Sequence, residues 1–146
     1  MSELPRRIVS RLRRYIGNRR RNKRAVVKLN CLLRLSDPRT NSNGRRQSTL
    51  GCHTLDLSTD GVALVVPAIR IDQHYLVGNE RRLYVTVELP SESIELTVVA
   101  VRYESLDEHP TEQGYLIGAR ITEANEPDLA RLAEFVNGHL VGQTGN

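Results

Sequence analysis

A carboxylate, a hydroxyl and a glycine stand close together in the stretch Leu55–Gly61. Asp56, Ser58 and Gly61 form the pattern Asp-x-Ser-x-x-Gly. An ionised carboxylate only accepts hydrogen bonds, whereas a hydroxyl both donates and accepts them. A glycine in or beside a strand marks a place where a ligand can approach the backbone closely. The same residues also suit an ordinary β-hairpin, in which Asp caps the turn and Ser bonds its own backbone, so the pattern alone leaves both interpretations open.

A strongly basic segment lies upstream of this pattern. Five of the seven residues in Asn18–Arg24 are basic, and Arg20 and Arg24 are spaced as Arg-x-x-x-Arg. Residues 1–46 carry a net charge of +13, whereas residues 47–146 carry −9. A solvated run of charge is one interpretation of such a segment. The asymmetry also predicts an anionic partner, which is a phosphate-bearing small molecule, nucleic acid, an acidic lipid surface or an acidic protein face.

The elements around Asp56 are predicted from period-2 alternation. Leu55 and Leu57 are expected to face one side of a strand, because successive side chains of a strand alternate. The other face then carries three polar side chains, those of Thr54, Asp56 and Ser58. Thr59–Gly61 is a predicted turn, because Asp and Gly adopt positive φ at low cost.

The whole chain has a mainly β pattern that ends in one helix. Strands are predicted over 25–35, 49–57, 62–66, 83–89, 94–103 and 115–121, with loops at 36–48 and 106–114 and little periodicity in 67–82. A helix is predicted from Glu126 to about Leu140, capped by Asn125 or Glu126, with an apolar stripe of Leu129, Leu132, Ala133, Val136 and Leu140. The pattern predicts a small six-stranded antiparallel β-barrel with a C-terminal helix packed on it.

The N-terminus reads as a basic amphipathic helix over Ser2–Gly17. Its apolar residues recur at helical spacing and its other positions are rich in arginine. Two interpretations stay open. We favour a helix packed on the barrel, and the alternative is an arm that contacts a membrane surface or a partner protein.

The sequence has no pattern typical of an enzyme or a metal site. Cys31 and Cys52 form no Cys-x-x-Cys pair, and the four histidines are scattered. We expect two buried, inert thiols; the alternative is a disulfide, which a reducing compartment disfavours. We expect no catalytic residue, no metal and no cofactor. No apolar run approaches the ~20 residues of a membrane-spanning helix. The first 25 residues are too charged for a secretory signal, so a cytoplasmic location is expected.

Together, the two patterns resemble the signatures of the PilZ domain family, Arg-x-x-x-Arg before the first strand and Asp/Asn-x-Ser-x-x-Gly further on. Gly61–Leu64, Val77-Gly78 and Gly118–Ile121 are similar to later landmarks of the family, in the same order. The resemblance covers residues 19–140. The basic arm at 1–18, expected from its own helical spacing and charge, lies outside the resemblance, which implies a PilZ-like split-barrel domain at 19–142.

The resemblance implies a non-enzymatic receptor for the bacterial second messenger cyclic di-GMP. Arginine suits this ligand because its fork matches phosphate oxygens and the guanine edge, and its plane stacks on purines. A carboxylate suits the guanine N–H donors. The implied ligand-binding residues are Arg19, Arg20, Arg21, Arg24, Asp56, Ser58, Gly61 and Gly118. Tyr103 and Tyr115 are the candidates for the aromatic residue that family members often place near the ligand.

Binding is expected to order the basic segment and to re-aim the arm of residues 2–17, with a protein partner as the receiver. The arm is also a candidate for contact with a membrane surface, whereas no stable nucleic-acid complex is expected. The competing function is a nucleic-acid- or membrane-surface-binding protein without dinucleotide recognition. That function predicts strong salt dependence without guanine selectivity.

Overall fold

The computed structural model describes residues 24–36, 48–106 and 114–144, with side chains as far as His139. Within these ranges lie nine strands and one helix: β1 Ala25–Val26, β2 Asn30–Arg34, β3 Leu50–Leu57, β4 Gly61–Val66, β5 Arg70–Ile71, β6 His74–Tyr75, β7 Arg82–Glu88, β8 Ser93–Ser105, β9 Tyr115–Glu123 and α2 Glu126–Thr144. The predicted helix at 2–17, the residues Arg19, Arg20 and Arg21, and most of the two predicted loops lie outside the described residues.

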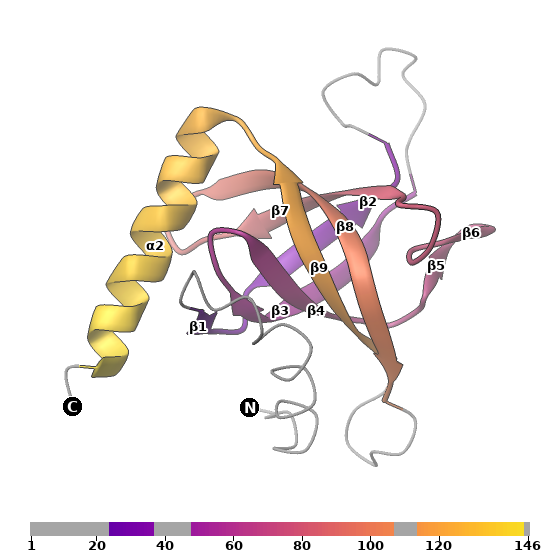
Figure 1. Ribbon diagram of the computed structural model, residues 1–146, viewed down its shortest axis with the longest axis horizontal. Helices are drawn as coiled ribbons and strands as arrows, with labels where there is room; N and C mark the ends of the chain where they lie inside the picture. The colour runs from indigo at the N-terminus through magenta and orange to yellow at the C-terminus, as the bar shows by residue number, and fades with distance from the viewer. Residues whose placement is uncertain (1–23, 37–47, 107–113, 145–146) are drawn as a thin grey trace.

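Six of the strands close an antiparallel barrel. Their order is β3-β2-β7-β8-β9-β4, and the β3–β4 pairing joins the two ends (Figure 1). Strand β1 pairs only with β3, outside the ring, and β5 and β6 form a separate hairpin. The predicted six-stranded antiparallel barrel with a C-terminal helix is therefore confirmed.

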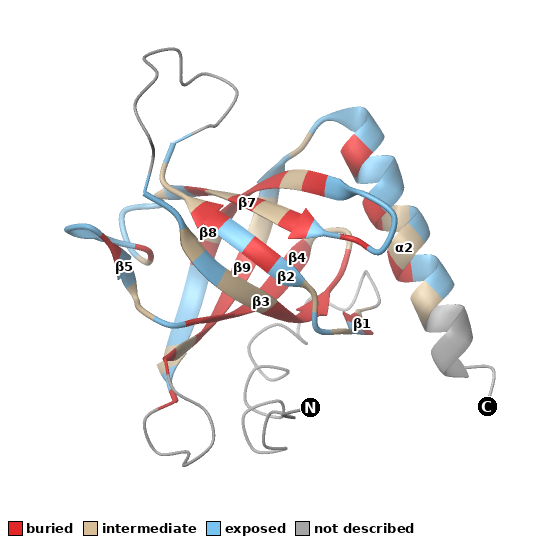
Figure 2. Ribbon diagram, turned by 180° about the vertical axis from the view of Figure 1, so that it is seen from behind, coloured by how far each residue is buried: buried red, intermediate tan, exposed pale blue. Residues whose placement is uncertain are grey.

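The core fills the barrel and reaches the helix. Strand β7 alternates as predicted, with Leu83, Val85 and Val87 buried, whereas all six residues of β4 are buried (Figure 2). This explains why the sequence of β4 is a continuous apolar run, since both of its faces are covered. Helix α2 stands beside one end of the barrel and adds Leu132 and Val136 to the core (Figure 1).

The start of α2 is fastened to the barrel through its first turn. The side chain of Asn125 caps the helix, because its Oδ1 accepts a hydrogen bond of 2.8 Å from the backbone N–H of Asp128. Asp128 Oδ2 in turn accepts one of 2.9 Å from the N–H of Glu95 in β8. The buried stripe thus runs through Asp128, Leu132 and Val136. The prediction that Leu129 belongs to this stripe is wrong, since Leu129 follows Asp128 by one residue and its side chain is exposed.

The single strand predicted over 25–35 is interrupted. Strands β1 and β2 pair with the same edge of β3, but residues 27–29 leave the regular ladder. The buried hydroxyl of Thr54 bonds to the backbone in this interruption between β1 and β2. It accepts a hydrogen bond from Leu29 N at 2.9 Å and donates one to Val27 O at 2.5 Å. A side chain therefore replaces ladder bonds here, which local sequence does not reveal.

The β5–β6 hairpin was not predicted. Its turn begins at Asp72, which adopts a positive φ of 56°, a conformation that Asp tolerates. Ile71 and Leu76 anchor the hairpin because both are buried in the main core. The hairpin is short and its anchors do not alternate regularly, so periodicity gave no signal for it.

Candidate ligand-binding face of the barrel

A β-bulge turns Asp56 toward the outside of the barrel. The register of β3 against β4 shifts between Thr54, which pairs with Leu64, and Asp56, which pairs with Ala63. Cross-strand partners share a face, so Asp56 lies on the face of Ala63, opposite the face of the core residue Leu64. A bulge inserts one extra residue into a strand and so changes the alternation.

The predicted common face of Leu55 and Leu57 is therefore wrong. Leu57 belongs to the main core inside the barrel. Leu55, the inserted residue, joins a second apolar cluster with Ala63, Val65, Leu106 and Leu116. This second cluster borders Asp56, whose side chain is only 3% exposed.

One row of cross-strand neighbours runs outward from Asp56. Asp56 pairs with Ala63 in β4, Ala63 with Gly118 in β9, and Gly118 with Arg102 in β8. Adjacent strands lie about 4.8 Å apart, so Asp56 and Gly118 are separated by roughly 10 Å. The two middle residues of the row have small side chains or none, and an arginine stands at its far end.

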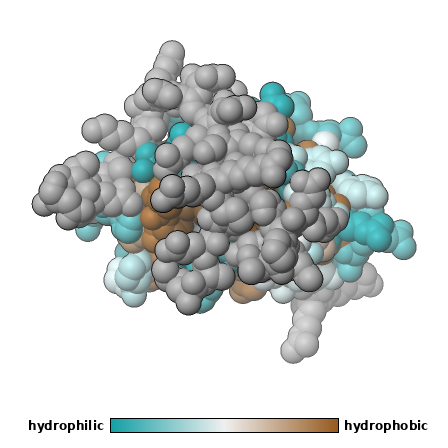
Figure 3. Space-filling model, turned by 90° about the horizontal axis from the view of Figure 1, so that it is seen from below, coloured by the Kyte–Doolittle hydropathy of each residue, from teal (hydrophilic) through white to brown (hydrophobic). Residues whose placement is uncertain are grey.

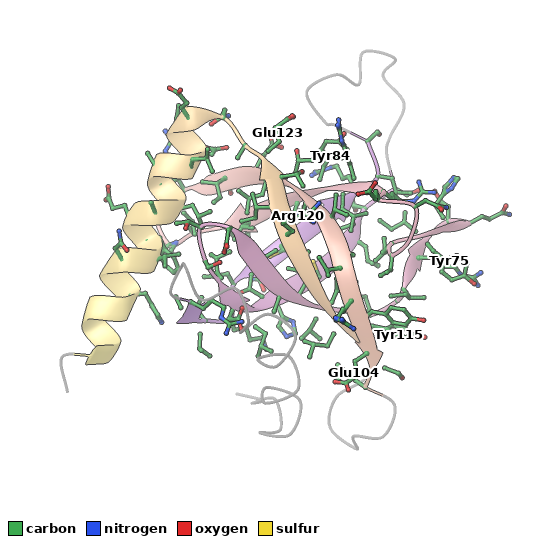
Figure 4. All side chains as sticks on the ribbon, in the orientation of Figure 1. Tyr75, Tyr84, Glu104, Tyr115, Arg120 and Glu123 are labelled. Carbon is green, nitrogen blue, oxygen red and sulfur yellow. The ribbon has the colours of Figure 1, made fainter. Side chains whose placement is uncertain are left out.

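A second row runs beside the first. Gly61 pairs with Arg120 in β9, and Arg120 pairs with Val99 in β8. Arg120 lies two residues from Gly118 in the same strand and so on the same face; Figure 4 labels it midway along β9. The two rows together bring a carboxylate, two glycines and two arginines to one face.

Ser58 holds the turn that follows Asp56. Its Oγ accepts hydrogen bonds from the backbone N–H groups of Asp60 at 3.3 Å and Gly61 at 3.0 Å, and it donates to Asp60 Oδ1 at 2.7 Å. Ser58 is 1% exposed. Its role in this structure is thus to shape the turn beside Asp56, as in the hairpin interpretation of the motif.

Gly61 is needed for close approach rather than for its backbone angle. The expectation of positive φ in the turn is wrong, because neither Asp60 nor Gly61 adopts it. A Cβ on Gly61 would lie 3.1 Å from the backbone oxygen of Ala119 in β9. The glycine therefore lets β9 pack tightly against the start of β4.

Arg24 brings the basic segment to the same face. It directly precedes Ala25, which pairs with Leu57 and is buried in the core, whereas Val26 pairs with Asp56. Arg24 lies one residue before β1, so continued alternation of the extended chain would place it on the face of Val26 and Asp56. Arg24 Nη1 is buried and has no hydrogen-bond partner among the described residues. A buried donor without a partner is costly, so this atom is suited to an anion.

The two predicted aromatic candidates lie elsewhere. The rings of Tyr103, near the end of β8, and Tyr115, at the start of β9, contact each other, with centroids 6.2 Å apart. Figure 4 labels Tyr115. Tyr103 pairs with Ile117, a core residue, and Tyr115 pairs with Val66, another core residue. Both tyrosines thus belong to the core-facing side of their strands, opposite the face of Asp56.

Sequence reasoning missed Arg102 and Arg120 as members of this face. A signal for Arg120 was present, because it follows Gly118 at the period of a strand. The sequence held no such signal for Arg102. The face on which Arg102 lies depends on another register shift, in the β8–β9 pairing between Ala100 and Arg102. The structure describes five of the eight predicted site residues: Arg24, Asp56, Ser58, Gly61 and Gly118. Asp56, Gly61 and Gly118 lie on β3, β4 and β9, which pair with one another in this part of the barrel, whereas Arg24 directly precedes β1 and Ser58 directly follows β3. The other three, Arg19, Arg20 and Arg21, lie outside the described residues.

The described residues offer few other sites. In these ranges, no three or more His, Cys, Asp or Glu side chains are grouped so as to hold a metal ion. No helix among them is long and apolar enough to cross a bilayer. Seen from below, a hydrophobic area lies among hydrophilic residues (Figure 3). The exposed large apolar side chains are spread over several elements: Val26, Leu32, Tyr75, Val101, Tyr103 and Leu129.

The family model of the PilZ domain matches residues 18–138. The chain belongs to the PilZ domain family. The match includes the Arg-rich segment, the Asp56 motif and most of α2. Among curated proteins, none matches the chain.

Solved structures with the same fold include three PilZ-type proteins of low sequence identity. The inhibitor of motility MotI/DgrA of Bacillus subtilis has a TM-score of 0.62 at 15% identity, and the match covers 85% of this chain and 52% of that one. The PilZ domain of Escherichia coli YcgR with c-di-GMP has a TM-score of 0.59 at 14% identity and coverages of 87% and 95%. Borreliella burgdorferi PlzA in complex with c-di-GMP has a TM-score of 0.53 at 13% identity, and the match covers 93% of this chain and 58% of that one. This chain thus spans about half the length of the Bacillus protein, and these likenesses concern the fold.

Proposed function

We propose that this PilZ protein is a non-enzymatic receptor for cyclic di-GMP, which binds on the face that carries Arg24 and Asp56. The observation that carries the proposal is the position of Arg24. Its guanidinium has a buried nitrogen without a hydrogen-bond partner among the described residues, and Arg24 directly precedes β1, in which Val26 pairs with Asp56. An arginine fork matches the oxygens of a phosphate group and the O6 and N7 atoms of guanine.

Asp56 supplies the selectivity for guanine in this proposal. Its carboxylate accepts hydrogen bonds from the N1–H and N2–H donors, which adenine does not present in the same arrangement. The row through Ala63 and Gly118 offers small side chains next to it, which suits a flat purine. Arg102 and Arg120 then add positive charge for the phosphates at the far side of the ligand.

The finer organisation of the chain is also part of the proposal. Residues 19–142 form the receptor domain, in which Arg19, Arg20 and Arg21 extend the contacts of Arg24. Five positive charges in Arg19–Arg24 repel one another until an anion neutralises them, so binding orders this segment. The arm at 1–18 then changes its position and presents residues 2–17 to a protein partner or a membrane surface.

The test is calorimetric binding of cyclic di-GMP, cyclic di-AMP and single-stranded RNA to the full chain at two salt concentrations. The proposal expects saturable binding with a preference of about tenfold or more for cyclic di-GMP over cyclic di-AMP, because the adenine dinucleotide loses one hydrogen bond to a charged group. Equal affinity for both dinucleotides would remove the role of Asp56.

The basic segment also supports a second candidate function, the binding of nucleic acid. Five of the six residues in Arg19–Arg24 are basic. They would bind the phosphates of RNA, and the affinity would fall steeply as the salt concentration rises. Asp56 disfavours this function, because a carboxylate next to Arg24 repels a phosphate backbone. Tight RNA binding with steep salt dependence and no dinucleotide binding would establish the second candidate instead.

A further inference from the structure

The two cysteines of the chain lie directly opposite each other on two adjacent, antiparallel strands. Cys31 in β2 is the register partner of Cys52 in β3. Directly opposed residues of antiparallel strands have Cα atoms about 4.5–5.5 Å apart. A disulfide requires about 4.4–6.8 Å. The ladder therefore holds the two thiols at a separation from which a bond can form without moving the backbone far.

Both side chains point to the same side of the sheet, and one of them is reachable. Cys31 is buried in the main core, and Cys52 packs against that core but stays partly exposed. Inside a barrel, side chains from neighbouring strands converge because the sheet is concave. The partial exposure of Cys52 differs from the prediction that both thiols are buried.

The environment of the pair favours the thiol form of its inner member. A hydrogen bond with Cys52 raises the pKa of Cys31 above its ordinary value, and burial raises it further. Cys31 Sγ also donates to the backbone oxygen of Leu29 at 3.5 Å. The outer thiol, Cys52, is thus the one that an external reagent reaches first, since the thiolate is the reactive form and access controls the rate.

We propose that Cys31 and Cys52 form a modification site, a reversible cross-strand disulfide made by exchange with a small-molecule disulfide. In the first step the Cys52 thiolate attacks one sulfur of the reagent, forms a mixed disulfide and releases one thiol. In the second step Cys31 loses its proton to solvent and attacks the Cys52 sulfur, so the protein disulfide forms and the second thiol leaves. The reagent gains the two electrons that the cysteines lose, and an excess of thiol reverses both steps.

The bond would fasten β2 to β3, the strand that carries Asp56 four residues after Cys52. It would also close the chain between residues 31 and 52 in the unfolded state, which stabilises the folded protein. For a chain of this length we expect the midpoint of thermal unfolding to rise by roughly 10 °C. The proposal is independent of the ligand, because both thiols belong to the core side and Asp56 lies on the opposite face.

The test uses the folded, reduced full chain with an excess of oxidised glutathione at mildly alkaline pH. Intact mass spectrometry should show the loss of two hydrogen atoms in a monomer, and peptide mapping should find Cys31 joined to Cys52. Reduction should restore the mass and lower the unfolding midpoint again. A stable glutathione adduct, a disulfide-linked dimer, or a protein that reacts only when unfolded would each overturn the proposal.

Two variants separate the steps. Cys31→Ser should stop at the mixed disulfide on Cys52, whereas Cys52→Ser should remain unmodified because Cys31 is buried. If Cys52→Ser reacts as fast as the wild type, the proposed order of attack is wrong. The wild-type experiment stands by itself if a serine in the core prevents Cys31→Ser from folding.

Discussion

Val26 and Asp56 face each other across the β1–β3 ladder. This pairing places the end of the basic segment beside the carboxylate of the Asp-x-Ser-x-x-Gly motif, although about 30 residues separate them in sequence. His139 of α2 also reaches this point, with its Nε2 atom 3.3 Å from the backbone oxygen of Val26. Strand β1 therefore connects the proposed ligand face with the C-terminal helix.

Replacement of Arg24 tests the phosphate or guanine contact. Arg24→Ala should lower the affinity for cyclic di-GMP by about tenfold or more, because a charge-assisted contact in a partly buried site is lost. Arg70→Ala is the matched control, since Arg70 is an exposed arginine on the separate β5–β6 hairpin. Equal affinities of the two variants by calorimetry would remove Arg24 from the site.

Replacement of Asp56 tests selectivity between bases. Asp56→Asn should weaken cyclic di-GMP binding and reduce its preference over cyclic di-AMP, because one acceptor becomes a donor. Asp72→Asn is the control, as it removes the same charge from an exposed turn and keeps a residue type that tolerates positive φ. The proposed role fails if both variants keep the wild-type ratio of affinities.

Arg102 and Arg120, which only the structure placed on the proposed binding face, are expected to contribute less to the affinity for cyclic di-GMP than Arg24. Arg102→Ala and Arg120→Ala should each reduce affinity by about threefold to tenfold, since their contacts are more screened by solvent. The loss should shrink at high salt, which titration at two ionic strengths measures. A loss that is the same for Arg70→Ala would indicate an effect of net charge alone.

Thr54 is expected to matter for stability rather than for binding. Thr54→Val keeps the shape of the side chain but leaves Leu29 N without its partner and removes the bond to Val27 O. The free energy of unfolding should fall by about 1–3 kcal/mol, as measured by urea denaturation. Thr86→Val is the control, because among the described residues the hydroxyl of Thr86 accepts a single bond, from the flexible side chain of Arg34. It should cost less than about 0.5 kcal/mol.

Gly114 should tolerate no side chain. It adopts a φ of 103°, and a Cβ there would lie 2.2 Å from the backbone oxygen of Val66. Gly114→Ala should therefore destabilise the fold by about 2 kcal/mol or more. Gly51→Ala, at a strand position with open space around it, should change the free energy of unfolding by less than about 0.5 kcal/mol. Similar unfolding curves for both variants would contradict the close approach.

The outline of the fold could be predicted from the sequence because its signals are local. Alternation in β7, apolar runs in β4 and the capping residue Asn125 each act over a few residues and determine the element in which they lie. The same holds for the motif at Asp56 and the basic segment, which the sequence shows without any knowledge of their distance in space. These local signals were sufficient for the barrel, the helix and the family.

The tertiary structure decided which side chains meet. The bulge at Leu55 separates Leu55 from Leu57 and turns Asp56 outward, and the hydroxyl of Thr54 divides the first predicted strand. Pairing across the barrel then joins Asp56 with Arg102 through Ala63 and Gly118, and Cys31 with Cys52. Register between strands depends on packing and hydrogen bonds between distant segments, so no pattern within a single segment carries this information.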